Sequence, residues 1–310
     1  MRPDITILDG GTGRELKRIG APFRQPEWSA LALMEAPALV KRVHASFIQA
    51  GADVITTNSY AVVPFHIGAP RFDEVGLALA ALAGRLAREA AEDARRPVRV
   101  AGCLPPICGS YRADWFDADF ARPILSTLVA GLQPHVDHWQ AETLSAIEEA
   151  DLVREIIGYD AKPLWLSFTV VDNETTKSPE PRLRSGQLVV DAVAAAMRLR
   201  AQAVLFNCSQ PEVMGEAVTV AHNFIMENHR SDPRAPAIGV YANAFAAVAK
   251  DARANSDVSD IRSDLTPTGY LTWVNDWITR GAQIVGGCCG IGPEHILTIS
   301  ESVRNQAKSD

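Results

Sequence analysis

The feature that most constrains this chain is a regular alternation of short apolar segments with helical stretches along all 310 residues. Several apolar segments lack alternating polar residues, which is typical of parallel strands covered on both faces. The stretches between them, as from Val75 to Leu86, carry apolar residues at three- and four-residue intervals and predict amphipathic helices. Helices are predicted over residues 72–96, 213–227 and 272–280, among others. Eight strands are predicted, over residues 5–8, 54–57, 98–103, 138–142, 164–168, 203–207, 237–240 and 283–287.

Eight strand–helix units predict an α/β fold that consists of a single (β/α)₈ TIM barrel, because a doubly wound sheet usually has fewer strands. The glycine-rich stretch at residues 9–13 lacks the spacing of a dinucleotide-binding loop. No segment rich in proline, glycine or serine divides the chain, so we expect one domain over residues 1–310. The one long polar interruption, residues 251–268, is expected to be an extended loop after the seventh strand.

Composition excludes several classes of partner. Asp and Glu outnumber Lys and Arg by 37 to 30, which gives a net charge of −7, and the absence of a basic cluster argues against nucleic acid. No apolar run is long enough to span a bilayer, so no membrane partner is expected. Five cysteines are an odd number and are sparse for this length, unlike the cysteines of a disulfide scaffold. The sequence begins without the pattern of a secretion signal. We therefore expect a cytoplasmic protein with reduced thiols, whose oligomeric state stays open.

Three of the five cysteines fall where chemistry gathers in such a barrel. Cys208 follows the sixth predicted strand, and Cys288 and Cys289 end the eighth. The loops at the C-terminal ends of the strands surround one mouth, so these thiols should converge there. Three thiolates suit Zn²⁺, and a site with three protein ligands leaves one position free for a substrate, as in catalytic zinc sites. The glycines around the adjacent pair permit the sharp turn that lets both side chains face one metal.

Other interpretations of the cysteines stay open. A buried cysteine is often simply a small core residue, and we expect this of Cys103 and Cys108. The pair Cys288–Cys289 could instead be a redox switch in a thiol sensor that folds without metal. Under that alternative, one reversible disulfide replaces the metal site.

A zinc-free lyase or aldolase on the same fold is a further alternative. Such an enzyme would need a Schiff-base lysine or a metal held by carboxylates, and lysine is scarce at the predicted strand ends. His135 and His138 have metal-like spacing. In a strand, however, positions i and i+3 face opposite sides, so we expect both histidines to be structural.

Six short motifs occur in a fixed order along nearly the whole chain. The most specific part is Asn207-Cys208 followed much later by Gly286-Gly287-Cys288-Cys289-Gly290. The others are Asp9-Gly10-Gly11, Thr57-Asn58-Ser59-Tyr60, Gly109-Ser110-Tyr111 and Glu142-Thr143. Together they resemble the homocysteine S-methyltransferase family.

The resemblance implies a (β/α)₈ barrel with zinc held by Cys208, Cys288 and Cys289, and homocysteine bound through its sulfur at the open position. The homocysteine amino group would meet acidic residues that match Asp9 and Glu142, and nearby loop backbone would receive its carboxylate. The family's asparagine after the seventh strand, which can occupy the open position without substrate, looks like Asn243. The substrate-binding residues implied in this way are Asp9, Gly10, Thr57, Asn58, Glu142, Thr143 and Asn243.

The sequence also departs from the family pattern. Arg14 stands where the family usually has a small hydroxyl residue, and Ala242 replaces a common proline before Asn243. Leu144-Ser145 replaces the usual Ile-Pro. None of these positions is an expected zinc ligand, so the departures bear on the donor and on the shape of the amino-acid pocket.

The expected chemistry follows from the properties of a thiol. A free thiol, with a pKa of about 8.5, is mostly protonated at neutral pH, whereas coordination to zinc deprotonates it. The thiolate would attack the methyl group of an onium donor in line, giving methionine without a protein general base. We expect S-methylmethionine as donor, then S-adenosylmethionine; a betaine-type donor, or another thiol or selenol acceptor such as selenohomocysteine, is the alternative. Ring faces attract such cations, and the candidate loop aromatics are Phe23, Trp28, Tyr60, Phe65, Tyr111, Trp115 and Phe116.

Overall fold

The computed structural model describes residues 5–159, 162–172, 180–229, 232–246 and 261–307. All eight predicted strands are present in it, and no strand end differs from the prediction by more than two residues. The strands are β1 (Thr6–Ile7), β2 (Val54–Thr56), β3 (Arg99–Leu104), β4 (His138–Leu144), β5 (Leu164–Phe168), β6 (Ala203–Asn207), β7 (Ala237–Tyr241) and β8 (Ile284–Val285).

The eight strands form one parallel sheet that closes on itself. Their order is β1-β8-β7-β6-β5-β4-β3-β2, so each strand pairs with its neighbour along the chain and β1 pairs with β8. A parallel bridge between Leu8 and Val54 joins the two ends of the sheet, and the Asp9 amide donates to the Val54 carbonyl at 3.0 Å. The predicted (β/α)₈ barrel is therefore confirmed.

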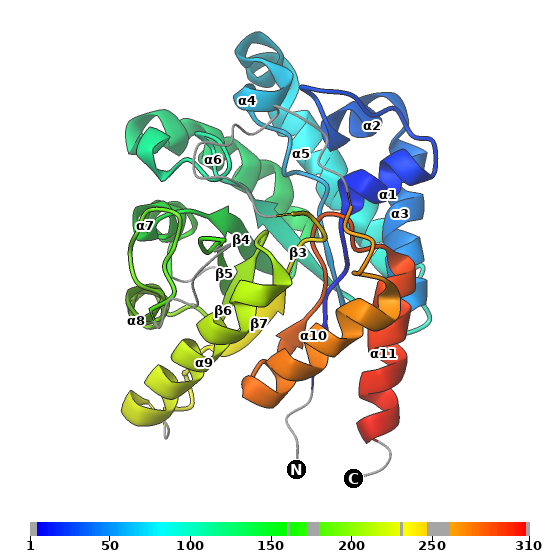
Figure 1. Cartoon of the computed structure of the whole chain (residues 1–310). Helices are drawn as coiled ribbons and strands as arrows, with labels where there is room; N and C mark the ends of the chain where they lie inside the picture. Colours follow the sequence, from blue (N-terminus) through cyan, green and yellow to red (C-terminus); the bar gives the residue numbers. More distant parts are fainter. Residues whose placement is uncertain (1–4, 160–161, 173–179, 230–231, 247–260, 308–310) are drawn as a thin grey trace.

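Helices surround the strands (Figure 1). They are α1 (Thr12–Arg18), α2 (Ser29–Glu35), α3 (Pro37–Ala50), α4 (Pro64–Ile67), α5 (Ala69–Glu92), α6 (Ala118–Leu132), α7 (Ile147–Ile157), α8 (Val189–Arg198), α9 (Pro211–Asn228), α10 (Pro267–Arg280) and α11 (Pro293–Ala307), with short 3₁₀ helices η1 (Ala113–Trp115) and η2 (Gln133–His135). Among the described residues, no helix is both long enough and apolar enough to cross a bilayer.

The ends of several helices differ from the sequence prediction. The helix predicted over residues 72–96 is α5, which begins at Ala69 and ends at Glu92. The loop predicted over residues 251–268 ends two residues earlier than predicted, because α10 begins at Pro267. The Thr266 side chain caps this helix by accepting a hydrogen bond from the Gly269 amide at 3.1 Å. Residues 251–260 of that loop lie outside the described residues.

The core has two layers, as expected for a filled barrel. The larger layer packs the outer faces of the strands against the helices. The smaller lies inside the barrel and is built by side chains from seven of the strands or their ends; Cys288 packs against it. Its members are Leu8, Val54, Ala101, Trp165, Ala203, Leu205, Tyr241 and Ile284. Polar groups directly above this inner layer therefore sit at the mouth of the barrel.

The two histidines with metal-like spacing lie apart from any metal-binding group found in the described chain. His138 begins β4 and is buried, with its ring centroid 4.2 Å from that of Trp165. His135 belongs to η2 rather than to the strand. The expectation that both are structural agrees with these positions, but the argument from strand geometry was wrong for His135.

Candidate functional site

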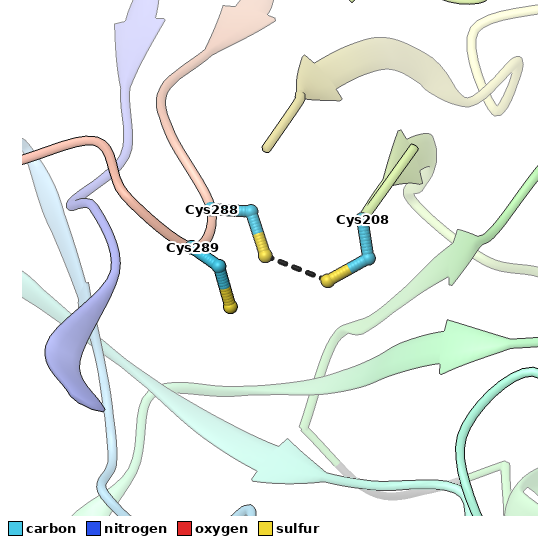
Figure 2. Close-up of side chains that lie close together, drawn as sticks. All are labelled: Cys208, Cys288 and Cys289. Carbon is cyan, nitrogen blue, oxygen red and sulfur yellow. Dashed lines mark hydrogen bonds between the residues drawn. The ribbon is translucent and has the colours of Figure 1, made fainter. Parts of the chain in front are cut away.

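Three cysteines converge at the mouth of the barrel. Figure 2 shows the side chains of Cys208, Cys288 and Cys289 pointing toward one another from the ends of β6 and β8. Their Sγ atoms all lie within 4.8 Å of one another, and those of Cys208 and Cys288 are 2.7 Å apart. Within the described ranges, this is the one group of three or more His, Cys, Asp or Glu side chains arranged to hold a metal ion.

Backbone hydrogen bonds join the loops that carry the cysteines to the loop after β7. The Cys288 amide donates to the Ala242 carbonyl at 2.9 Å, and the Ala244 amide donates to the Cys289 carbonyl at 2.8 Å. The Asn243 amide donates to the Ser209 carbonyl at 3.1 Å, beside Cys208. The loop after β7 is therefore the link that holds the two cysteine loops at a fixed separation.

Backbone strain gathers at the same place. Cys208 has a φ of 52°, Thr143 has 57° and Tyr111 has 66°, values that non-glycine residues seldom adopt. Such strain persists only where surrounding contacts enforce it, and it is common at functional sites. Asn207 supplies contacts of this kind, because its Oδ1 accepts from the Thr143 amide at 3.1 Å while its Nδ2 donates to Thr143 Oγ1 at 2.9 Å.

The glycines of the first and last motifs allow two loops to pack closely. A Cβ atom added to Gly10 would lie 2.2 Å from the Ile291 carbonyl oxygen, and one on Gly11 would lie 2.6 Å from the Cys288 carbonyl oxygen. A Cβ on Gly287 would lie 2.1 Å from Ile291 Cγ2. Residues 9–11 and 286–291 therefore form one packed unit around the cysteines.

We expect Gly287→Ala to destabilise the fold and to loosen the cysteine group together. The added methyl group must displace the Ile291 side chain, at a cost of about 1–3 kcal/mol. Urea unfolding and metal titration of the purified variant measure the two effects. Gly13→Ala is the control, since its Cβ would make only ordinary contacts, with Phe23 Cε2 at 3.5 Å and Ser29 Cβ at 4.0 Å. Equal stability and equal metal affinity in the two variants would contradict the prediction.

The three thiols cannot all ionise in this enclosed position without a compensating cation. Hydrogen bonds from Cys208 and Cys288 lower the pKa of Cys289 well below its ordinary value, and the nearby Arg14 guanidinium lowers it further. The pKa of Cys208 rises to about 12, because the lowering effect of Cys288 is outweighed by the thiolate of Cys289 and by burial. One thiolate hydrogen-bonded to two thiols is a set of sulfur ligands that a soft metal cation would stabilise.

Two carboxyl groups lie inside the barrel at the same mouth. Asp9 follows β1 and is 4 % exposed, and Glu142 lies near the end of β4. Burial raises the pKa of Asp9 to about 8, and the negative charge of Glu142 adds to the rise. Hydrogen bonds from the Thr56 amide (2.7 Å) and the Thr56 hydroxyl (3.1 Å) lower the pKa, but by less than burial raises it. Burial also raises the pKa of Glu142. Two enclosed carboxyl groups of this kind favour a cationic ligand between them.

The other expected binding residues have partners within the protein. Thr57 Oγ1 lies 2.9 Å from Ser59 Oγ and accepts from the Cys103 amide at 3.0 Å. Asn58 Nδ2 donates to the Ser29 carbonyl at 3.1 Å. Asn243 Oδ1 accepts from the Phe245 amide at 3.1 Å. These side chains brace the loops around the mouth, and each is buried.

Two of the candidate aromatic residues lie beside the cysteines. Burial raises the pKa of Tyr60 and of Tyr111 well above the ordinary value, and the negative charge of nearby Cys208 contributes to both shifts. Tyr60 Oη lies 2.6 Å from Ser110 Oγ. By contrast, Trp115 is 43 % exposed, with the Arg112 guanidinium stacked on its ring. Tyr60 and Tyr111 are therefore the aromatic side chains best placed to border the site.

A model of the homocysteine S-methyltransferase family matches residues 6–303, nearly the whole chain. This chain belongs to that family. It is therefore an S-methyltransferase that acts on a thiol or selenol acceptor, and the expected family membership is confirmed.

Among family members, the selenocysteine methyltransferase of Astragalus bisulcatus is 29% identical to this chain over 94% of it and 90% of the relative. The homocysteine S-methyltransferase of Escherichia coli is 29% identical over 96% and 95%. The crystal structure of the Escherichia coli homocysteine methyltransferase MmuM in its metallated form superposes with a TM-score of 0.75 at 26% identity, covering 96% of each chain. The likeness thus extends over full chains.

Two of the expected departures from the family pattern, at Arg14 and Ala242, lie close to the site. Arg14 is on α1, and its guanidinium carbon is 5.0 Å from the centroid of the Phe245 ring. After the hydrogen bonds from Cys208 and Cys288, the positive charge of Arg14 is a smaller cause of the lowered pKa of Cys289. Ala242 carries the carbonyl that accepts from Cys288. Arg14 therefore adds a cation at the mouth of the barrel.

Two further residues at the site have no sequence motif of their own. Tyr270, on α10, accepts from the Ala242 amide at 3.1 Å and donates to the Gly286 carbonyl at 2.8 Å, so it fastens the ends of β7 and β8. Cys103, expected to be a plain core residue, is buried as predicted but donates to Glu142 Oε2 at 3.1 Å. Neither contact joins neighbours in sequence, and the sequence therefore carries no signal for it.

Proposed function

We propose that this chain is a zinc-dependent methyltransferase that moves a methyl group from an onium donor to the sulfur of homocysteine, giving methionine. The observation that supports the proposal most is that three converging thiols share one barrel mouth with two carboxyl groups, the buried Asp9 and the half-buried Glu142. The thiols suit a metal that activates sulfur, and the carboxyl groups suit the ammonium group of an amino acid.

The donor set fits zinc. Three cysteine sulfurs, joined by no fourth His, Cys, Asp or Glu ligand among the described residues, match a catalytic zinc site, which keeps one position for a substrate. Soft sulfur ligands select zinc over magnesium or calcium. Cys208, Cys288 and Cys289 would hold the ion, which when bound supplies the positive charge that lowers the pKa of an incoming thiol.

The carboxyl groups would bind and orient the acceptor. Asp9 and Glu142 would take the ammonium group of homocysteine, and the loop backbone around Gly10 would take its carboxylate. Thr57, Asn58 and Thr143 would support these groups through the contacts described above, and Asn243 would border the open side of the cysteines. This arrangement would bring the acceptor sulfur to the three thiols while the two carboxyl groups hold the amino group of the acceptor.

The transfer step needs alignment rather than a general base. The acceptor sulfur attacks the methyl carbon as the bond from that carbon to the donor sulfur breaks, and the electron pair leaves with the donor sulfur. With S-methylmethionine as donor, both products are methionine. Tyr60 and Tyr111 would face the positive charge of the donor, which their rings attract, and the barrel mouth holds both reactants in line.

S-methylmethionine is the first proposed donor and S-adenosylmethionine the second. A betaine-type donor remains an alternative, and so does a selenol acceptor, which the selenocysteine methyltransferase of Astragalus bisulcatus favours by its similarity. A zinc-free barrel with a Cys288–Cys289 redox switch is the alternative of another class. The reduced thiols that the proposal needs suit the cytoplasm.

Metal analysis combined with turnover tests the proposal. Protein purified under reducing conditions is expected to contain about one zinc per chain. It should form methionine from homocysteine with at least one donor of a panel that includes S-methylmethionine, S-adenosylmethionine and glycine betaine. Zinc-free protein with full turnover, or zinc-loaded protein inactive with every donor, would overturn the proposal.

A further inference from the structure

A cluster of buried polar side chains surrounds Glu142 inside the barrel, and the proposed methyl transfer does not use it. Gln140, on the same strand β4, donates from Nε2 to Glu142 Oε1 at 2.7 Å. Tyr241, at the end of β7, donates from its hydroxyl to the same oxygen at 3.0 Å. Cys103, on β3, donates from Sγ to Oε2 at 3.1 Å. Donors from three strands therefore meet on one carboxyl group.

We propose that Cys103, Gln140 and Tyr241 are positioning residues that fix the Glu142 carboxylate toward the amino group of the acceptor. The proposal rests on the function proposed above, because it assumes that Glu142 meets an amino group. It goes further by assigning the selectivity for α-amino thiols to residues that touch neither the metal site nor the substrate.

The orientation of Gln140 supports this assignment. The side chain is fully buried, and its Nε2 also donates to Tyr241 Oη at 3.2 Å. The reversed amide would place Oε1 against the carboxylate oxygen, where two acceptors repel each other. Gln140 therefore orients both Glu142 and the tyrosine that also donates to it.

The chemistry of Cys103 suits the same role. Burial, with the adjacent Glu142 charge, raises the pKa of this thiol well above its ordinary value, so the proton stays on sulfur and is available for donation. The Cys103 amide donates to Thr57 Oγ1, and Ser59 Oγ donates to the Cys103 carbonyl at 2.9 Å. The motif after β2 thus holds the cysteine in register with Glu142.

The three donors also limit what Glu142 can bind. A carboxylate offers about four lone-pair sites, and the three donors fill most of them. The remaining acceptor capacity suits a single ammonium proton. Loss of one donor would let the carboxylate rotate and would raise its cost of remaining charged inside the barrel. The effect should therefore fall on acceptors with an amino group and spare those without one.

Calorimetry of acceptor binding to the zinc-loaded protein, without a methyl donor, tests the proposal. The acceptors are homocysteine and 4-mercaptobutyrate, which is homocysteine without its amino group. For Tyr241→Phe we expect a roughly tenfold weaker binding of homocysteine, and for Cys103→Ala a roughly threefold weaker one, with 4-mercaptobutyrate unchanged. Matched controls are Tyr159→Phe, at a side chain 57 % exposed, and Cys108→Ala, at a thiol outside the cluster; both should keep the wild-type preference.

The outcomes separate this proposal from the function on which it rests. Wild-type protein that binds homocysteine better than 4-mercaptobutyrate, with variants that keep the same preference, would overturn the positioning role alone. Variants that weaken both acceptors equally would do so too, because a general structural defect acts on both. Wild-type protein that binds neither acceptor would overturn both proposals. Zinc content measured for each variant should equal that of the wild type.

Discussion

Cys208→Ser is expected to remove bound zinc and to reduce methionine formation by roughly a thousandfold or more, since it deletes one of three metal ligands. A serine hydroxyl stays protonated where a thiol becomes a thiolate, and it is a harder ligand that zinc binds poorly in a thiolate set. Cys208 is also the one ligand that reaches the site from β6, so the two ligands left would both come from the loop after β8 (Figure 2). Zinc analysis and turnover with the active donor measure the two losses.

The control for this prediction is Cys108→Ser. The Cys108 sulfur lies 3.9 Å from the Asp117 carbonyl and outside the three-cysteine group, so zinc content and turnover should stay at wild-type values. Circular dichroism should show that both variants keep the barrel fold. A Cys208→Ser protein that retains a full complement of zinc and normal turnover would contradict the assignment of the ligands.

Asp9→Asn is expected to stabilise the metal-free, substrate-free protein at alkaline pH while it weakens homocysteine binding. Burial raises the pKa of Asp9 from 3.8 to about 8, so the folded state holds a proton that the unfolded state releases between these values. A raised carboxyl pKa destabilises the fold as pH rises from about 4 to 8, by up to an amount on the order of 5 kcal/mol. Asparagine carries no charge, so its advantage should grow through this window and vanish below it.

Urea unfolding of wild type and variant from acid to alkaline pH measures the stability difference. Asp73→Asn, at an exposed carboxylate on α5, is the matched control and should follow the wild-type curve. The homocysteine KM of Asp9→Asn should rise roughly a hundredfold, because an ammonium group loses a buried ionic partner. Parallel stability curves for wild type and Asp9→Asn, or an unchanged KM, would contradict the prediction.

The fold could be predicted from the sequence because its signals are local. Each strand is a short apolar run that parallel pairing covers on both faces, so segments such as residues 164–168 and 203–207 were predicted with their observed bounds. The helix at Pro267 was placed late because its first turn is polar and its cap is a single threonine. Ends of this kind depend on hydrogen bonds that composition does not show.

The sequence by itself determined the barrel, the family and the three cysteines, because motifs at strand ends must meet at one mouth once the strands close in order. Only the tertiary structure decided which side chains support them. Cys103, Gln140 and Tyr241 come from three strands and meet on Glu142, and Tyr270 reaches from α10 to fasten the cysteine loop. These contacts depend on register across the barrel and on side-chain direction. The register and the side-chain directions are set only when the eight strands close into the barrel, so no single segment of the chain determines them.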